Sequence, residues 1–212
     1  MRICTTNPNK VAEFGGLLAP IDIRLIPTAL DFPETEKTFS DNAVEKAMNY
    51  ARVYPGEWLL SEDSGLVVPA LDGRPGPYSA RFADLELTAK GPIIRESHRG
   101  REEMDRANNI RVLEMMADVP QHQRGAYFVC YTVVIDPQGN RAFEVERRAY
   151  GQVIEELRGD GGFGYDPIFM SAAAFGRTWA ELDSARKNLM SHRSKAIWDL
   201  MAWLCSTSRD IS

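Results

Sequence analysis

The sequence has little of what builds disulfide scaffolds, zinc knuckles or membrane anchors. Its three cysteines, Cys4, Cys130 and Cys205, lie far apart and form no CxxC pair, which argues against a disulfide framework and against a zinc knuckle. The longest apolar stretch, 126–135, is too short to span a bilayer, and the first residues lack the apolar core of a signal peptide. We therefore expect a soluble protein of the reducing cytoplasm with no membrane partner.

Positive charge is also scarce. The 212 residues include 25 Lys and Arg against 30 Asp and Glu, which gives a net charge of −5. This balance disfavours a surface that coats duplex DNA, so we expect no nucleic-acid partner, while a local basic pocket stays possible. The hydrophobic fraction of 44% excludes disorder and fits one large globular domain or two small lobes that share a core.

Segments typical of strands and of helices alternate along the chain. Alternating or continuous apolar residues predict strands over 2–6, 21–25, 58–60 and 126–135, the last turning at 136–140 into a strand that ends at Tyr150. Capping residues and apolar stripes predict helices after Asn7, Thr38 and Ser191, and one marked by Ile110, Leu113 and Ala117 that ends before Pro120. The tally predicts an α/β layer fold around a mixed sheet.

Residues 5–10, Thr-Thr-Asn-Pro-Asn-Lys, lie where the first strand gives way to a helix. Free backbone N–H groups, the helix dipole and the Lys10 ammonium could converge there on an anion. The glycine spacing of a Walker motif is absent, and a well-capped helix with an exposed lysine explains the same residues. Both interpretations stay open at this point.

Glu62 and Asp63 follow an apolar strand and precede Ser64-Gly65. Strand ends often carry hard-cation sites, but neighbouring side chains of a regular strand diverge, so both carboxylates could reach one Mg²⁺ only if the backbone turns near Gly65. Glu34 or Glu36, in a loop rich in Pro and Thr, could complete such a site, since Mg²⁺ often takes one or two protein carboxylates. A solvated acidic turn is the alternative.

Four glycines within six residues mark the loop 159–167, which also carries two aromatic residues and an aspartate. Close-approaching backbone, aromatic rings and an acceptor carboxylate are what holding a planar heterocycle requires, although a tight turn with Phe163 in the core is an alternative. Lys187 and Ser191-His192-Arg193 add donors near the last helix, where an ordinary surface histidine is the alternative. The acidic and basic candidates together suit phosphoryl or nucleotidyl chemistry on a magnesium-bound polyphosphate.

Taken together and in order, these segments resemble the inosine triphosphate pyrophosphatase family, hydrolases of non-canonical purine nucleoside triphosphates. The resemblance spans nearly the whole chain. It rests on the segments Thr5–Lys10 with Glu13, Thr38–Ala43 with Lys46-Ala47, Glu62–Leu66, Gly73–Arg81, Gly162–Pro167, Lys187 and Ser191–Arg193.

The resemblance implies one domain over 1–212, with a long mixed central sheet flanked by helices, two lobes and the active-site cleft between them, usually in a homodimer. It further implies Mg²⁺-dependent hydrolysis of ITP, dITP or XTP to the nucleoside monophosphate and pyrophosphate. Carried over by position, Glu34, Asp63 and Glu62 would serve the metal, and Asp63 would also orient or deprotonate the attacking water. Substrate binding would fall to Thr5, Thr6, Asn7, Lys10, Lys46, Ser64, Phe163, Gly164, Tyr165, Asp166, Lys187, His192 and Arg193, with Phe163 stacking on the base and the last two reading its 6-oxo edge.

Three departures from the family pattern and two rival functions accompany this interpretation. Glu62 stands where many bacterial members have Asp, Thr6 replaces a common Gly, and 85–101 looks like an insertion. The rivals are a pyrophosphatase of the related Maf type, acting on pyrimidine or modified nucleotides, and a catalytically silent nucleotide-binding module. The Ser191-His192-Arg193 segment argues against the Maf type.

Overall fold

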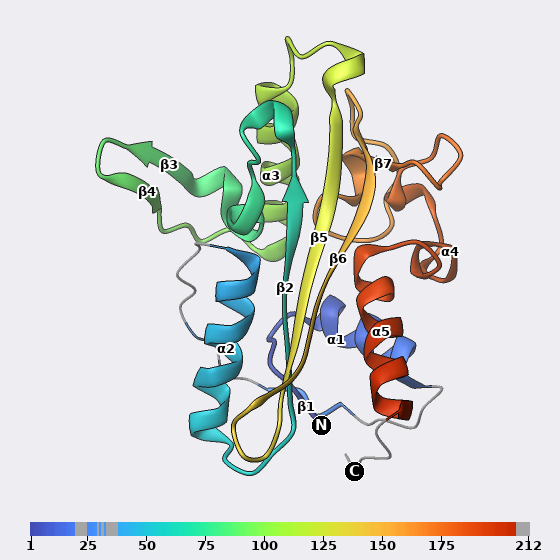
Figure 1. Cartoon of the computed structure of the whole chain (residues 1–212). Helices are drawn as coiled ribbons and strands as arrows, with labels where there is room; N and C mark the ends of the chain where they lie inside the picture. Colours follow the sequence, from blue (N-terminus) through green and yellow to red (C-terminus); the bar gives the residue numbers. More distant parts are fainter. Residues whose placement is uncertain (20–24, 29, 31, 33–37, 207–212) are drawn as a thin grey trace. The chain divides into compact units, whose positions relative to one another are not determined.

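The computed structural model describes residues 1–19, 25–28, 30, 32 and 38–206. Within these residues the main sheet has five strands in the order β1-β2-β5-β6-β7 (Figure 1). The strands are β1 Arg2–Ile3, β2 Leu59–Val67, β5 Gly125–Ile135, β6 Arg141–Val153 and β7 Phe169–Ser171, and a separate hairpin pairs β3 Leu85–Thr88 with β4 Gly91–Ile94. Strand β1 runs parallel to β2 whereas β6 and β7 are antiparallel. The predicted mixed sheet with flanking helices is therefore confirmed.

The described helices are α1 Pro8–Leu18, α2 Phe39–Val53, α3 Arg101–Met115, α4 Ser184–Asn188 and α5 His192–Ser206, joined by short 3₁₀ turns of which the longest is Gly76–Asp84. Three of them, α1, α2 and α5, begin where the capping residues predict. The Asn7 side chain accepts from the Asn9 N–H, Thr38 from that of Asp41, and Ser191 from that of Ser194. Each cap satisfies an N–H that the first helical turn leaves without an intrahelical partner, so three helix starts are set by local sequence.

The chain divides into two compact units. The first comprises Met1–Ser64, Val129–Arg148 and Ser191–Ser212, and the second comprises Gly65–Phe128 and Ala149–Met190. Strands β2, β5 and β6 each contribute residues to both units.

The core of the first unit follows from the two-residue alternation of its strands. Leu60 and Val134 pack with α1 and α5, whereas their neighbours Leu59, Val133 and Ile135 pack with α2. Successive side chains of a strand point to opposite faces, so a strand that is apolar at every position needs helices on both sides. Figure 1 shows α2 on one face of these strands and α1 and α5 on the other.

The core of the second unit centres on three aromatic rings. Phe128 of β5 stacks on Trp179 with ring centroids 4.9 Å apart, and Phe169 of β7 meets both rings edge-on at 4.9 and 4.8 Å. Val112 and Met116, from α3 and the residue that follows it, close the same cluster. Edge-to-face and offset ring pairs add to the stabilisation that burial provides.

Several predicted boundaries are wrong or untested. The predicted strand 2–6 shortens to β1, whereas the one over 58–60 extends through Val67. The predicted helix exists as α3, but two of the three residues that marked it do not lie on its buried face. Ile110 is exposed and Ala117 lies beyond the helix end, whereas the buried residues are Asn108, Asn109 and Val112. Residues 85–101 form the β3–β4 hairpin and the link to α3. The strand over 21–25 falls almost wholly outside the described residues, although Ile26 bridges Arg2.

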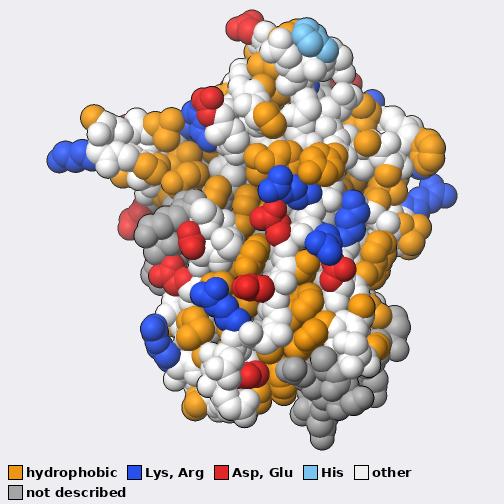
Figure 2. Space-filling model, viewed as in Figure 1, with side chains coloured by type: hydrophobic (Ala, Val, Ile, Leu, Met, Phe, Trp, Pro, Cys, Tyr) orange, Lys and Arg blue, Asp and Glu red, His pale blue; other side chains and the backbone are white. Residues whose placement is uncertain are grey.

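Acidic and basic side chains are interspersed on the face shown in Figure 2, where neither sign forms a continuous area. Within the described stretches of the chain, no helix is both long and apolar enough to cross a membrane. The three cysteines are free thiols, with Cys4 and Cys130 buried and Cys205 exposed. The absence of nucleic-acid and membrane partners stays a prediction.

Arg124 is a buried cation held by backbone carbonyls of the second unit. Its guanidinium donates to Met116 O at 2.6 Å, to Val153 O at 2.9 Å and to Ile154 O at 2.9 Å, and its exposure is 2%. A buried charge is costly unless hydrogen bonds replace its hydration. The Arg124 side chain therefore joins the end of α3 to the end of β6, and these hydrogen bonds compensate for its burial.

Replacing Arg124 by Met should therefore destabilise the protein. The substitution keeps the apolar stem but leaves several buried carbonyls without their donor, so we expect the free energy of unfolding to fall by about 3 kcal/mol. Urea denaturation followed by circular dichroism would measure the change. Arg147→Met is the control, because Arg147 pairs with Asp199 at the surface and should cost less than about 1 kcal/mol. Equal effects of the two substitutions would contradict the prediction.

Candidate functional site

Glu62 and Asp63 lie inside strand β2, which continues without interruption to Val67. The turn near Gly65 that would let both carboxylates reach one Mg²⁺ is therefore not formed. Gly65 serves a different purpose, because a Cβ there would lie 2.2 Å from Ser79 Oγ, the atom that accepts the Leu66 N–H. Since adjacent residues of a strand face opposite ways, the two carboxylates have different neighbours.

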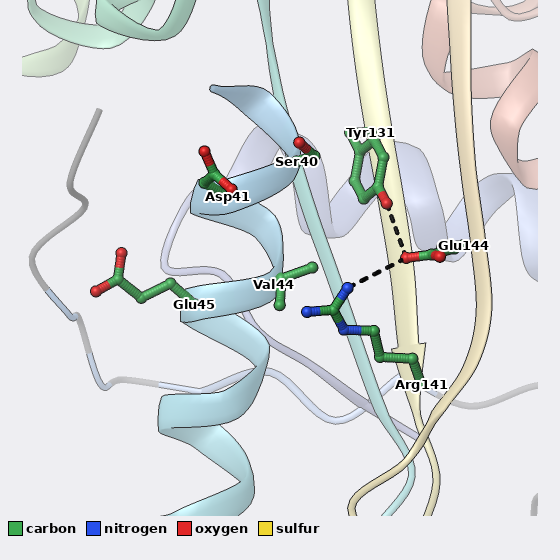
Figure 3. A pocket seen from close by; sticks show the side chains of 7 residues that line it. All are labelled: Ser40, Asp41, Val44, Glu45, Tyr131, Arg141 and Glu144. Atoms are coloured by element: carbon green, nitrogen blue, oxygen red, sulfur yellow. Dashed lines mark hydrogen bonds and ion pairs between the residues drawn. The ribbon is translucent and has the colours of Figure 1, made fainter. Parts of the chain in front are cut away.

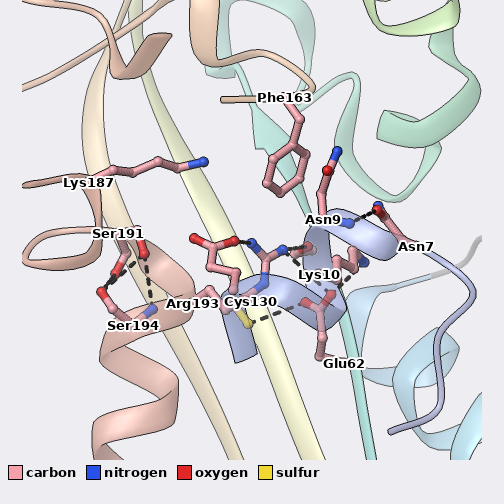
Figure 4. Close-up of polar contacts among 12 residues, drawn as sticks. Asn7, Asn9, Lys10, Glu62, Cys130, Phe163, Lys187, Ser191, Arg193 and Ser194 are labelled. Atoms are coloured by element: carbon pink, nitrogen blue, oxygen red, sulfur yellow. Dashed lines mark hydrogen bonds and ion pairs between the residues drawn. The ribbon is translucent and has the colours of Figure 1, made fainter. Parts of the chain in front are cut away.

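Glu62 is the centre of a buried charge cluster in the first unit (Figure 4). Its Oε1 lies 2.5 Å from Lys10 Nζ of α1 and 3.5 Å from Arg193 Nη2 of α5, and its residue exposure is 2%. Burial alone would raise the pKa of Glu62, but the positive charges of Lys10 and Arg193 outweigh it and hold the pKa well below its usual range. Glu62 is therefore ionised, and it fixes two cations that sequence reasoning assigned to substrate binding.

Two further groups complete the cluster. Arg193 Nη1 donates to Glu13 of α1, and Nη2 donates to Ser64 Oγ at 2.9 Å. On the other carboxylate oxygen, the Cys130 thiol donates to Glu62 Oε2 at 3.4 Å, and burial raises the pKa of that thiol far above its ordinary value. Cys130 is therefore a neutral donor here and not a reactive thiolate.

Asp63 faces helix α2. Its Oδ2 accepts a 3.0 Å hydrogen bond from Asn42 Nδ2, and Asn42 is wholly buried. Lys46, one turn further along α2, is buried as well. Spacing of four residues puts Asn42 and Lys46 on the same side of the helix, so α2 brings a neutral donor and a cation to one face.

The remaining candidates of the first unit differ in exposure. Thr5 is buried and its hydroxyl accepts the Asn7 N–H at 3.1 Å, whereas Thr6 is exposed. His192, the first residue of α5, is buried, so the ordinary surface histidine is excluded. The exposed lysine at the start of α1 is excluded too, because the Lys10 side chain is 15% exposed and ion-paired.

The glycine loop of the second unit is built on positive φ angles and close contacts. Gly162 and Gly164 have φ of +69° and +63°, which L side chains rarely adopt. A Cβ at Gly159 would lie 2.5 Å from the Ala180 carbonyl carbon, and one at Gly162 would lie 2.0 Å from Asp166 Oδ2. Some of these glycines are needed for a positive φ angle and others for close contact with neighbouring atoms. A single tight turn would not need both.

Asp166, Lys187 and Phe163 meet within this loop region. Asp166 Oδ2 accepts the Phe163 N–H at 2.9 Å and Lys187 Nζ at 2.6 Å, with both charged side chains buried. The same ammonium lies 4.5 Å from the Phe163 ring centroid, where the ring face attracts a cation. Tyr165 is buried, and its hydroxyl donates to Ser79 O at 2.8 Å. Phe163 itself stays half-buried, so the alternative that places it in the core is not what the structure shows.

A pocket of the first unit, about 460 Å³ in volume, contains none of the predicted residues. It lies between α2 and strands β5 and β6, and Tyr131 donates to Glu144 on its wall at 2.8 Å (Figure 3). Burial and Glu144 together raise the pKa of Tyr131 to about 12. The tyrosine therefore stays protonated in the neutral range and offers no acid–base chemistry there.

Sequence reasoning missed three residues that hold the candidates in place. Glu13 was noticed only as part of a motif, yet it pairs with Arg193. Asp105 and Asn109 of α3 bind the glycine loop, but the sequence marks that helix only by its apolar residues and assigns no role to its polar ones. The sequence offered one signal, the adjacent pair Asn108-Asn109 within a helical segment, and the structure shows that both are buried, which is unusual for asparagine.

The residues present suit a magnesium ion that a substrate helps to hold. Within the described part of the chain, no three His, Cys, Asp or Glu side chains form a metal cluster, and Glu34 falls outside that part. Mg²⁺ commonly takes one or two protein carboxylates and completes its shell with phosphate oxygens and water. Asp63, a buried carboxylate that accepts a hydrogen bond from the neutral Asn42 amide, fits that use.

The fold and the two groups of residues define an α/β protein with buried, carboxylate-anchored cations and a glycine loop carrying an aromatic ring. The Ham1 family model matches residues 1–203, and the chain belongs to the Ham1 family. A protein named dITP/XTP pyrophosphatase from Ralstonia nicotianae is 42% identical over 207 residues, covering 94% of this chain and 93% of that protein. Another of that name, from Desulforamulus reducens, is 39% identical over 200 residues, covering 92% and 90%.

Solved structures agree. A HAM1 protein from Coxiella burnetii superposes with a TM-score of 0.77 at 32% identity, covering 97% of this chain and 98% of that one. The Ham1 protein of Staphylococcus aureus gives the same TM-score at 30% identity, covering 97% of each chain. These comparisons confirm the family resemblance drawn from the motifs.

Glu62→Gln tests the charge cluster. The amide keeps the shape but removes the negative charge that compensates Lys10 and Arg193, so we expect unfolding free energy to fall by about 3 kcal/mol. Chemical denaturation would measure this. Glu57→Gln is the matched control, because Glu57 pairs with Arg2 in a more exposed setting and should cost under about 1 kcal/mol. A Glu62 variant as stable as the control would show that the cluster is not held by this charge.

Gly162→Ala tests the glycine loop. The added methyl group would push Asp166 Oδ2 away from Lys187 and would also occupy a positive φ, so we expect a loss of at least about 2 kcal/mol. Thermal and urea unfolding would report it. Gly16→Ala should act in the opposite direction by about 0.5–1 kcal/mol, because Gly16 lies in α1 with nothing within 4 Å of the new methyl group. Unchanged stability of Gly162→Ala would contradict the predicted strain.

Proposed function

We propose that this protein hydrolyses non-canonical purine nucleoside triphosphates, ITP, dITP and XTP, to the nucleoside monophosphate and pyrophosphate in a Mg²⁺-dependent reaction. Membership of the Ham1 family and the names of its relatives support the substrate class. The observation that carries the proposal in this chain is the set of cations around buried Glu62 and Asp63, namely Lys10, which Glu62 anchors, and Lys46 of α2, whose charge also acts on Glu62. Preorganised cations next to a carboxylate are what charge stabilisation on a polyphosphate requires.

The cations of the first unit would bind the phosphates. Lys10, with its ammonium held by Glu62, and Lys46 on α2 would neutralise the triphosphate, and Asn7 would bind it at the start of α1. Thr5 and Thr6, which directly precede Asn7, would contact the phosphates as well. Because Glu62 is already committed to Lys10, we propose that it serves the metal only indirectly, by fixing the surrounding charges or a metal-bound water.

Asp63 would hold Mg²⁺ together with Glu34. When bound, the metal ion would supply Lewis-acid polarisation of the phosphate oxygens. Asp63 would also orient the attacking water or accept its proton, and the Asn42 amide holds this carboxylate in one orientation. The water would then attack the innermost phosphorus, with pyrophosphate as the leaving group.

The base would be recognised by side chains of the glycine loop and of the last helix. Phe163 would stack on the purine, with Gly164, Tyr165, Asp166 and Lys187 shaping its surroundings. His192 and Arg193 would read the 6-oxo edge, and Arg193 can most easily release its neutral contact with Ser64 for this purpose. Donors aimed at an oxo group would stay unpaired against a 6-amino group, which disfavours ATP.

Asp63→Asn tests the catalytic part of the proposal. We expect pyrophosphate release from ITP to fall by about 10²- to 10⁴-fold, because the amide cannot accept a proton and binds Mg²⁺ poorly, while ITP binding largely persists. A coupled pyrophosphate assay and calorimetric ITP binding would measure the two effects. Asp118→Asn, an exposed aspartate, should leave turnover unchanged. Full activity of the Asp63 variant would remove Asp63 from this role.

The same assay separates the enzyme from its rivals. A parent protein that binds ITP without turnover would be a silent module, and preferred turnover of UTP or dTTP would point to pyrimidine nucleotides. Solvent oxygen-18 should appear in the monophosphate product, since the water attacks the α-phosphorus. We further propose a homodimer, to be tested by light scattering, and a reducing cytoplasmic location, which three free thiols favour.

A further inference from the structure

Helix α3 attaches the glycine loop to the second unit through the two backbone groups of a single residue. The Gly164 N–H donates to Asp105 Oδ2 at 2.9 Å, and the Gly164 carbonyl accepts from Asn109 Nδ2 at 2.7 Å. Asn109 Nδ2 also donates to the Asp105 carbonyl at 2.7 Å, which is one helical turn earlier. We call Asp105 and Asn109 the Gly164 clamp.

The clamp acts on a residue that has no side chain to pack. Gly164 has φ of +63°, and no atom lies within 4 Å of where a Cβ would be, so no side-chain contact at this position fixes its backbone. Glycine also has the largest backbone freedom to lose on folding. With both its N–H and its C=O bound to one helix, Gly164 has the two peptide planes that it joins oriented by α3.

The residue before Gly164 is Phe163, the ring proposed to stack on the base. The Phe163 N–H is bound to Asp166, and Asp166 holds Lys187 against the Phe163 ring. Rotation of the Gly164 peptide would therefore move the ring and its partners together. Asn109 is 2% exposed and Asp105 is half-buried, so both clamp residues lie on the side of α3 that faces the protein interior.

We propose that Asp105 and Asn109 are positioning residues for base recognition, which act through Gly164 by fixing the ring plane of Phe163. The expected effect on substrate binding rests on the proposed function, whereas the hydrogen bonds of the clamp do not depend on it. The clamp should raise affinity and base discrimination without entering the chemical step, because it contacts neither the phosphates nor the proposed metal ligand.

Asn108 provides a matched control on the same helix. It is as buried as its neighbour, but its side chain binds Ala83 N, Ser79 O and Ala80 O, in the 3₁₀ segment Gly76–Asp84. Removing either asparagine side chain deletes buried hydrogen bonds from α3. Only Asn109 loses contact with Gly164, so a difference between the two variants reports the clamp and not general damage.

The experiment compares Asn109→Ala, Asp105→Ala, Asp105→Asn and Asn108→Ala with the parent. For the two clamp alanines we expect KM for ITP to rise by about tenfold with kcat within about twofold, and the preference for ITP over ATP to fall, because about one loop hydrogen bond is lost. Asp105→Asn keeps an acceptor for the Gly164 N–H and should restore both parameters. Asn108→Ala should lower the melting temperature without changing KM or preference.

Hydrogen exchange of the peptide covering 159–167 gives a readout that does not need activity. Faster exchange in Asn109→Ala than in Asn108→Ala supports the clamp. Equal exchange in the two, or a fall in kcat at constant KM, overturns the inference. If the parent releases no pyrophosphate from ITP, the proposed function fails, and the exchange comparison still decides whether the clamp exists.

Discussion

The first unit depends on the burial of one ionised carboxylate, that of Glu62. Removing a charge from water costs several kcal/mol unless opposite charges and donors replace its hydration. In this protein the replacements come from α1, α5 and β5, in the form of Lys10, Arg193 and Cys130. The elements must therefore meet at one place, and Lys10 and Arg193 are held in fixed positions by the same carboxylate.

The second unit contains two more buried cations, and each is satisfied differently. Arg124 has carbonyl partners and joins α3 to β6, whereas Lys187 pairs with Asp166 and lies over an aromatic ring. The planar guanidinium can serve several fixed carbonyls at once, while an ammonium is a compact charge that one carboxylate can neutralise. The first arrangement suits a structural joint, and the second suits a position that is to meet a ligand.

Local rules predicted much of the frame, and they failed where burial involved polar residues. Asn7, Thr38 and Ser191 cap helices as expected because capping needs only neighbours in sequence. The continuous apolar run of β5 likewise predicted a strand covered on both faces. The apolar pattern does not mark the buried face of α3, because Asn108 and Asn109 occupy much of it. Glu62 and Asp63 are buried inside β2, although charged residues after an apolar run predict the end of a strand.

The order of short motifs along the chain was enough to indicate the family and the set of residues to consider. It could not tell which carboxylate faces which cation, because that depends on strand alternation and on partners far away in sequence. Glu62 and Arg193 are 131 positions apart, and Asp105 and Gly164 are 59 apart. Only the packed strands and helices bring such pairs within hydrogen-bond distance, since no local preference extends beyond a few turns of chain.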